Sequence, residues 1–151
     1  MRAIESLEDP QLRDELLYVG LHGWAEKESR QAVSWVLARP RSQMRMQLLI
    51  TGFSSFVVKE PAAAMDMAEE LSSAERQQVL PSMFANWASI NARSAAARAE
   101  RVEDTGLRSQ SLSSVAMNWA TSQPDEALRW AASLPDADSQ PVMNMVVTQI
   151  A

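Results

Sequence analysis

Large apolar residues recur along this chain at an almost constant spacing of about 31–32 residues, which lies within the range of known structural repeats. The set is Trp24, Phe56, Trp87, Trp119 and Ile150. An alanine follows each of the first four after eight residues, and these are Ala32, Ala64, Ala95 and Ala127. A fixed period of this length is typical of stacked helical repeats, in which each unit buries its apolar side against its neighbours. The period predicts an all-α fold, an α-α superhelix (solenoid) of about four and a half two-helix repeats.

Each period is predicted to hold a shorter helix A and a longer helix B. Proline is favoured at the first position of a helix, so Pro61 and Pro124 mark the start of two A helices. Ser72-x-x-Glu75 has the pattern of a capping box, and Pro81 predicts a kink inside the B helix that follows. The predicted B helices cover about 10–24, 42–57, 73–88, 105–120 and 138–150, and the A helices 29–38, 61–71, 92–102 and 124–134.

The repeats are predicted to form one helical-repeat domain over residues 1–151. The units run over about 1–24, 24–56, 56–87, 87–119 and 119–151. The opening letters RAIESL match the close of an A helix, and the chain stops one residue after Ile150. Terminal repeats normally carry a polar outer face. We therefore expect either a segment of a longer solenoid or ends that are covered by self-association.

The B helices carry no charged residue beyond their first turn. The uncharged stretches are 16–25, 46–57, 77–88, 109–120 and 140–151. They contain the methionines Met46, Met83, Met117, Met143 and Met145. Two interpretations stay open. The B helices form a crowded inner side in which methionine fills gaps, or they offer a neutral and adaptable surface for protein binding.

Arginine recurs eleven residues before the first four of these large apolar positions, as Arg13, Arg45, Arg76 and Arg108. These arginines fall in the first turn of a B helix, where the helix dipole disfavours a cation, so each needs a partner. In a structural interpretation, they form a ladder to carbonyls at the end of an A helix or to acids such as Glu28 or Glu60. In a functional interpretation, they face an acidic peptide or a phosphate. The acidic net charge favours the ladder.

The five tryptophans can be interpreted as core residues or as a surface platform that binds a ligand. Trp24, Trp87 and Trp119 keep the period, and Trp35 and Trp130 share one position in the A helices. Core residues keep a repeat period because each unit must fill the same space. We therefore predict core packing for the tryptophans rather than a platform for sugars or peptides.

Composition and motifs argue against most other functions. A net charge of −5 and a pI near 4.9 argue against nucleic-acid or membrane partners. The chain has no cysteine, no apolar run long enough for a membrane helix and no apolar signal core. Localisation stays open, cytoplasmic by default and periplasmic if the parent protein is secreted. His22 and Glu26 alone do not make a metal site. We predict no enzyme and no cofactor.

The stretch WATSQPDEALRWAASLPD resembles repeats found in bacterial proteins. More broadly, nearly the whole chain resembles the α-solenoids, the class of tetratricopeptide and HEAT-like proteins. The chain departs from the tetratricopeptide pattern, since its period is shorter, at about 31–32 residues, and the Trp-x2-Leu-Gly-x2-Tyr signature is missing. The resemblance implies right-handed superhelical stacking and a role in protein interaction. It implies no individual functional residue.

Three functional hypotheses follow. The leading one is a non-catalytic scaffold that binds a protein or peptide along a groove between repeats. The second is a structural module that forms homo-oligomers through uncapped ends or the uncharged B helices. The third is a HEAT-like nucleic-acid reader or base-repair enzyme that uses the arginine row, which requires a continuous positive face.

Overall fold

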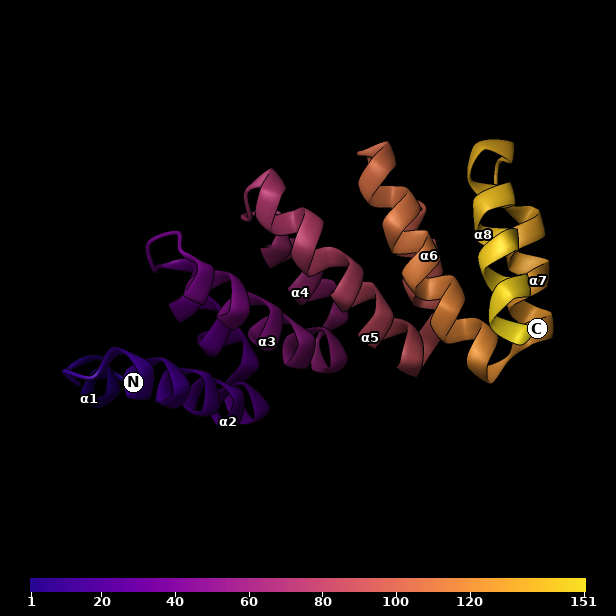
Figure 1. Ribbon diagram of the computed structural model, residues 1–151. Helices are drawn as coiled ribbons and strands as arrows, with labels where there is room; N and C mark the ends of the chain where they lie inside the picture. The colour runs from indigo at the N-terminus through magenta and orange to yellow at the C-terminus, as the bar shows by residue number, and fades with distance from the viewer. The chain divides into compact units, whose positions relative to one another are not determined.

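The computed structural model describes residues 1–151 and consists of helices without any strand (Figure 1). This confirms the all-α prediction. The chain divides into two compact units, Met1–Val79 and Leu80–Ala151, which are described separately below. The helices are α1 (Arg2–Glu5), α2 (Pro10–Leu37), α3 (Gln43–Lys59), α4 (Pro61–Ala68), α5 (Ser73–Ala99), α6 (Thr105–Ser122), α7 (Pro124–Ser133) and α8 (Asp136–Ile150). None of these helices combines the length and the apolar character needed to cross a membrane.

The helices begin where the sequence predicts capping. Pro61 and Pro124 are the first residues of α4 and α7. The capping box is present, because Ser72 N donates to Glu75 Oε2 at 3.0 Å and Glu75 N donates to Ser72 Oγ at 3.4 Å. Asp9 caps α2 by accepting from the backbone of Gln11 at 3.0 Å. The predicted starts at Pro61 and Pro124 and the predicted capping box rest on local chemistry, and the structure confirms them.

Four residues interrupt the helical backbone with nearly the same dihedral angles. They are Glu28 (φ −136°, ψ 63°), Glu60 (φ −135°, ψ 69°), Asn91 (φ −147°, ψ 83°) and Gln123 (φ −144°, ψ 71°). Their spacing along the chain follows the period of the large apolar residues. We call them the break residues. Each one separates a predicted B helix from the A helix that follows it.

The break residues explain why the structure has fewer separate helices than the sequence predicts. Glu60 and Gln123 precede a proline, which disfavours helical angles at the residue before it and lacks the N–H that would join the helices. Glu28 and Asn91 precede Ser29 and Ala92. At these two positions a B helix and an A helix merge into the single helices α2 and α5, with a break inside each.

The break in α5 lies at Asn91 and not at Pro81. The sequence predicts a kink at Pro81, but Asn91 is the residue of α5 with non-helical angles. Proline removes one backbone N–H, which would otherwise bond the carbonyl of Gln77. Gln77 is an exposed residue, and the helix continues through the proline.

The first unit has its core between α2 and α3, which lie side by side in Figure 1. Leu21 from α2 and Phe53 and Phe56 from α3 are fully buried there. A Cβ atom added at Gly52 would lie 3.0 Å from Val33 Cγ2. The absence of a side chain at this position therefore lets α3 approach the second part of α2 closely.

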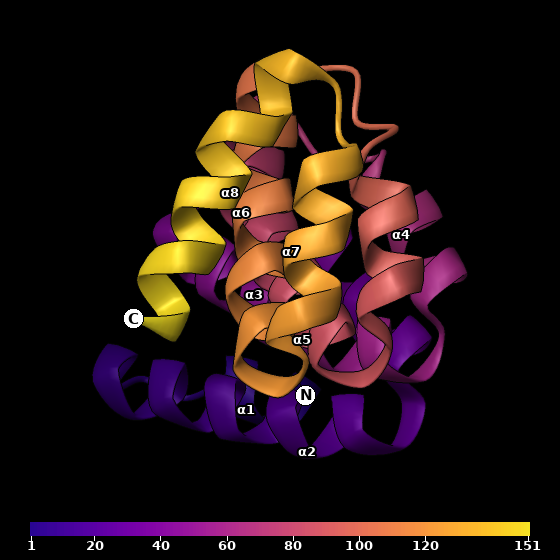
Figure 2. The ribbon, with the colours of Figure 1, turned by 90° about the vertical axis from the view of Figure 1, so that its right-hand side faces the viewer.

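The core of the second unit includes the packing of α6, α7 and α8 (Figure 2). Val115 and Trp119 from α6, Ala127 from α7, and Val142 and Val146 from α8 are buried. The recurrence of apolar residues three or four apart along α6 and α8 places these side chains on one side of each helix. All of them belong to stretches that the sequence predicts as helices.

The alanine position of the period is more uniformly buried than the aromatic position. The alanines eight residues on are all 0% exposed, namely Ala32, Ala64, Ala95 and Ala127. At the aromatic position, Phe56 and Trp119 are buried, Trp24 and Trp87 are half-buried, and Ile150 is 44% exposed. The predicted core packing of the tryptophans therefore holds fully for Trp119 and in part for Trp24 and Trp87, while Phe56 is buried and Ile150 is exposed.

The indole N–H groups of Trp24 and Trp119 make corresponding hydrogen bonds. Trp24 Nε1 donates to Glu28 Oε2 at 3.0 Å, and Trp119 Nε1 donates to Gln123 Oε1 at 3.1 Å. Both acceptors are break residues. A buried indole needs such a partner, so the polar edge of the ring lies where the helix ends. The same rings also meet the A-helix tryptophans, Trp35 at 6.2 Å and Trp130 at 5.3 Å between centroids.

Candidate functional site

Arg45 is the most deeply buried member of the arginine row. Its side chain is 9% exposed and its Nε donates to Glu75 Oε1 at 2.9 Å. Its Nη1 donates to the carbonyl of Leu37 at 2.7 Å and also to the carbonyl of Arg39. Both carbonyls lie at the end of the A-helix part of α2, where orphan acceptors need donors. The guanidinium thus donates hydrogen bonds to one carboxylate and two backbone carbonyls within the first unit.

Arg108 makes corresponding contacts in the second unit. Its Nε donates to Asp138 Oδ2 at 3.1 Å, and its Nη1 donates to the carbonyl of Val102 at 3.3 Å. In both units the acid follows the arginine by 30 residues. The carbonyl precedes the arginine by six residues in both cases. Two positions of the period therefore make the same polar contact in separate parts of the chain.

The other positions of the row differ. Ser139 takes the fifth place, and its Oγ donates to the carbonyl of Ala131 at 2.8 Å, eight residues earlier, as Arg45 does to Leu37. Arg13 Nε lies 3.7 Å from Asp14 Oδ1, and the Arg13 side chain is 36% exposed. Thirty residues after Arg13 and Arg76 the chain has Gln43 and Gly106, which supply no carboxylate.

The acidic partners of the row differ from those suggested by the sequence. Glu28 accepts from Trp24, and Glu60 Oε2 accepts from Arg30 Nη2 at 3.0 Å. These two acids are break residues, which follow the end of a B helix, whereas Arg45 lies near the start of one. The carboxylates that reach Arg45 and Arg108 instead start the next B helix. Arg45 and Arg108 are occupied by contacts inside their own units, which leaves them little capacity for an external phosphate.

Glu75 combines the capping box with the Arg45 ion pair. Burial raises the pKa of Glu75, but the hydrogen bonds from the Ser72 backbone and hydroxyl and the attraction of Arg45 together outweigh it. The pKa therefore lies below its ordinary value of 4.5. One carboxylate thus links the start of α5 to the start of α3.

This lowered pKa predicts a loss of stability in acid. A carboxyl group with a lowered folded-state pKa stabilises the fold above its unfolded pKa, and that contribution disappears as the pH falls through the folded-state value. We expect the urea midpoint of the wild type to fall below pH 4.5 more steeply than that of Glu75→Gln. The exposed Glu70→Gln is the control and should follow the wild type. Equal slopes for the wild type and Glu75→Gln would contradict the lowered pKa.

The residues considered for catalysis or metal binding lie apart from any such cluster. His22 and Glu26 are exposed on α2. Glu26 Oε1 accepts from Ser55 Oγ at 3.1 Å, and its carbonyl accepts from Lys59 Nζ. The structure brings together no group of three or more His, Cys, Asp or Glu side chains that could hold a metal ion.

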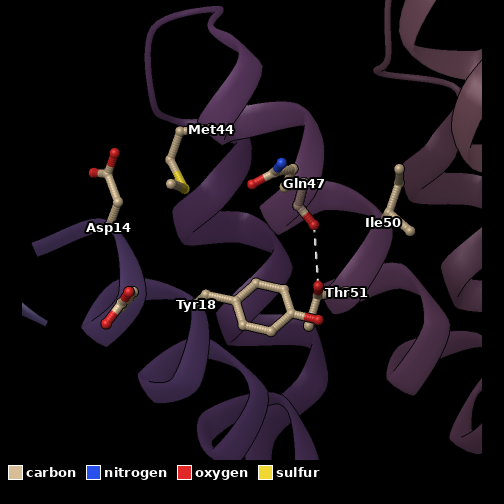
Figure 3. A pocket seen from close by; sticks show the side chains of 7 residues that line it. Asp14, Tyr18, Met44, Gln47, Ile50 and Thr51 are labelled. Atoms are coloured by element: carbon tan, nitrogen blue, oxygen red, sulfur yellow. Dashed lines mark hydrogen bonds between the residues drawn. The ribbon is translucent and has the colours of Figure 1, made fainter. Parts of the chain in front are cut away.

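An open groove of about 550 Å³ lies between α2 and α3 (Figure 3). It is lined by Asp14, Glu15, Tyr18, Met44, Gln47, Ile50 and Thr51, and we call it the α2/α3 groove. Its lining is more apolar than polar, with two carboxylates contributed by α2. The Thr51 hydroxyl donates to the carbonyl of Gln47 at 3.0 Å, so this hydroxyl is already satisfied.

The sequence interpretation did not identify this groove. Tyr18 and Ile50 hold the same position in successive B helices, six residues before the aromatic, but neither was singled out. A signal was available in α2, because Tyr18 lies next to Leu17 of the buried side and so widens the apolar surface beyond one stripe. The depth of the groove still depends on how closely α3 packs against α2.

The large exposed apolar side chains all lie on B helices. They are Leu12, Leu16, Tyr18, Val19, Val58, Ile90, Met117, Val147 and Ile150. The methionines of these helices range from fully buried Met83 to Met117, which is 42% exposed. The methionines of the uncharged stretches therefore divide between core and surface. Some methionines fill the core, and others contribute to a neutral surface.

Comparisons with protein-family models, with curated proteins and with solved structures find no match to this chain.

Proposed function

We propose that this chain is a helical-repeat module that binds other proteins and performs no catalysis. In this proposal, repeats of about 31–32 residues stack as a right-handed α-solenoid, and the B helices supply the binding surface. The observation that carries the proposal is the exposed apolar surface of the B helices, together with the α2/α3 groove and its two carboxylates.

The repeat architecture is supported by features that keep the period. The four break residues recur at this interval with similar angles, and the alanines at one position are all fully buried. The contacts of Arg45 recur at Arg108. Local backbone, core packing and polar contacts thus follow one interval. Such agreement between levels is expected when each unit fills the same structural role.

The chemistry of the α2/α3 groove favours a partner segment that carries a basic side chain beside apolar ones. Asp14 and Glu15 supply negative charge, and the ion pair of Arg13 with Asp14 is long, at 3.7 Å. Tyr18, Met44 and Ile50 supply apolar contact area. Aromatic and methionine side chains are enriched at the centres of protein interfaces. A lysine or arginine of the partner would pair with the carboxylates while its neighbours contact the apolar lining.

A displayed library of short random peptides tests this proposal. We expect peptides selected on the wild-type chain to carry a lysine or arginine next to an aliphatic or aromatic residue. Ile50→Ser removes apolar lining and Glu15→Lys reverses a charge, and each should weaken the selected peptides by about tenfold or more. Affinities are measured by fluorescence anisotropy with the synthesised peptides.

The control for both variants is Val58→Ser, which changes an exposed apolar residue of α3 outside the groove. It should bind the selected peptides like the wild type. Circular dichroism checks that each variant keeps its helix content, and Glu15→Lys lies at an exposed position where folding is tolerant. Selected peptides that bind both groove variants as tightly as the wild type, or a library that yields no enrichment, would overturn the proposal.

A further inference from the structure

The α2 helix exposes an apolar position that is buried in the other B helices. Leu16 lies eight residues before Trp24 and is 38% exposed. The residues eight before the other members of the period are at most 1% exposed, and they are Leu48, Val79, Ser111 and Val142. Leu12 and Val19 lie one turn to either side of Leu16 and are 45% and 65% exposed. We call Leu12, Leu16 and Val19 the leading face.

The α8 helix has the opposite pattern. Its Val142 is buried, while Val147 is 49% and Ile150 is 44% exposed. Val147 lies three residues before Ile150. The residues three before the other members of the period are fully buried, and they are Leu21, Phe53, Phe84 and Ala116. We call Val147 and Ile150 the trailing face.

These two patterns identify which neighbour covers each face. In the first unit α3 follows α2, and Leu21 of α2 is buried while Leu16 is not. In the second unit α6 and α7 precede α8, and Val142 of α8 is buried while Val147 is not. The position of Leu16 and Val142 therefore meets a preceding helix, and the position of Leu21 and Val147 meets a following one. The leading face therefore corresponds to the side of a B helix that meets the preceding helix, and the trailing face to the side that meets the following one.

The charge distribution and the local packing are compatible with contact between the leading face and the trailing face. Residues 16–25 and 140–151 contain no charged side chain. The charged residues nearest in sequence to the leading face are Arg13, Asp14 and Glu15, which lie between Leu12 and Leu16. The short helix α1 already lies against α2, because a Cβ atom added at Gly20 would be 3.3 Å from Ile4 Cδ1. A Cβ atom added at Gly52 of α3 would likewise lie 3.0 Å from Cγ2 of Val33, which belongs to a predicted A helix. By this comparison, α1 occupies the place of an A helix beside the leading face.

We propose that copies of this chain associate head to tail, with the trailing face of one copy packed on the leading face of the next. Since the two faces differ, the contact is heterologous, and association can continue beyond a dimer. This inference rests on the repeat architecture proposed above. It does not depend on peptide binding in the α2/α3 groove, because different residues form that groove.

The test uses analytical ultracentrifugation of the whole chain over a wide range of concentration. The average mass of the wild type should rise with concentration and pass that of a dimer. Leu16→Asp destroys the leading face and Val147→Asp the trailing face, so each variant alone should associate about a hundredfold more weakly or worse. An equal mixture of the two should form a dimer and nothing larger, because only one intact pair of faces is left.

Val58→Asp is the matched control, since it adds the same charge at a residue that is 47% exposed and outside both faces. It should associate like the wild type. A wild type that stays monomeric, or a mixture of Leu16→Asp and Val147→Asp that forms no dimer, would overturn the proposal. Loss of peptide binding in these variants without any change in association would assign the faces to another protein instead. Ile50→Ser keeps the two proposals apart, because it should lose peptide binding and still associate.

Discussion

Replacing Phe56 by alanine is expected to lower the free energy of unfolding by about 3–5 kcal/mol. Phe56 is fully buried, and its ring centroid lies 6.4 Å from that of Phe53. The Arg30 guanidinium carbon lies 5.8 Å from the centroid of the Phe56 ring. Removal of the ring loses the transfer free energy of its carbons and leaves a cavity that the surrounding helices can close only partly. Urea unfolding followed by circular dichroism measures the change.

The period supplies a matched control at the same repeat position. Ile150 is 44% exposed, so Ile150→Ala should cost less than about 1 kcal/mol. The comparison is made at low protein concentration, where self-association does not add to stability. Phe56→Leu keeps most of the volume and should cost about 1 kcal/mol. Equal losses for Phe56→Ala and Ile150→Ala would show that position in the period, and not burial, decides the cost.

Removing one partner of the Arg45–Glu75 ion pair is expected to cost about 3 kcal/mol. The two side chains are 9% and 8% exposed, so a single replacement leaves a buried charge without its partner. Glu75→Ala also removes the acceptor for the Ser72 backbone at the start of α5. Arg45→Met should have a similar effect, because Glu75 is then held by Ser72 alone. Urea midpoints of both variants measure the loss.

A double-mutant cycle separates the ion pair from these side effects. The variant with both Arg45→Met and Glu75→Ala should lose clearly less than the sum of the two single changes, because no unpaired charge remains buried. The Arg108–Asp138 pair is a natural comparison, since its side chains are 24% and 13% exposed. Asp138→Ala should cost less than Glu75→Ala, because water screens the remaining arginine better. Additive losses at Arg45 and Glu75 would contradict a coupled pair.

Much of the local structure could be predicted from the sequence. Pro61 and Pro124 begin helices, and Ser72 with Glu75 forms the capping box, because these features depend on neighbouring residues and backbone geometry. The boundary between B and A helices was also placed close to the break residues. At Pro81 the helix continues, and the residue of α5 with non-helical angles is Asn91, which the sequence did not indicate.

The candidate site was harder to predict. The arginine row was visible, and its need for partners followed from the helix dipole. Its acidic partners were not Glu28 and Glu60, because several acids share the right spacing and only packing selects one. The α2/α3 groove was missed entirely. A groove forms between two helices in contact. Its depth depends on how closely they pack, which cannot be predicted from the sequence of either helix alone.

The sequence by itself determined the helical class, the constant interval between equivalent positions, the helix starts and the uncharged stretches of the B helices. These depend on residues close together in the chain and on repetition, which are readable without coordinates. Only the tertiary structure decided which positions of the period are buried. Phe56 and Ile150 hold the same place in the repeat, yet one is covered on all sides and the other is open. Burial depends on the helices that pack against a residue, and those differ between Phe56 and Ile150.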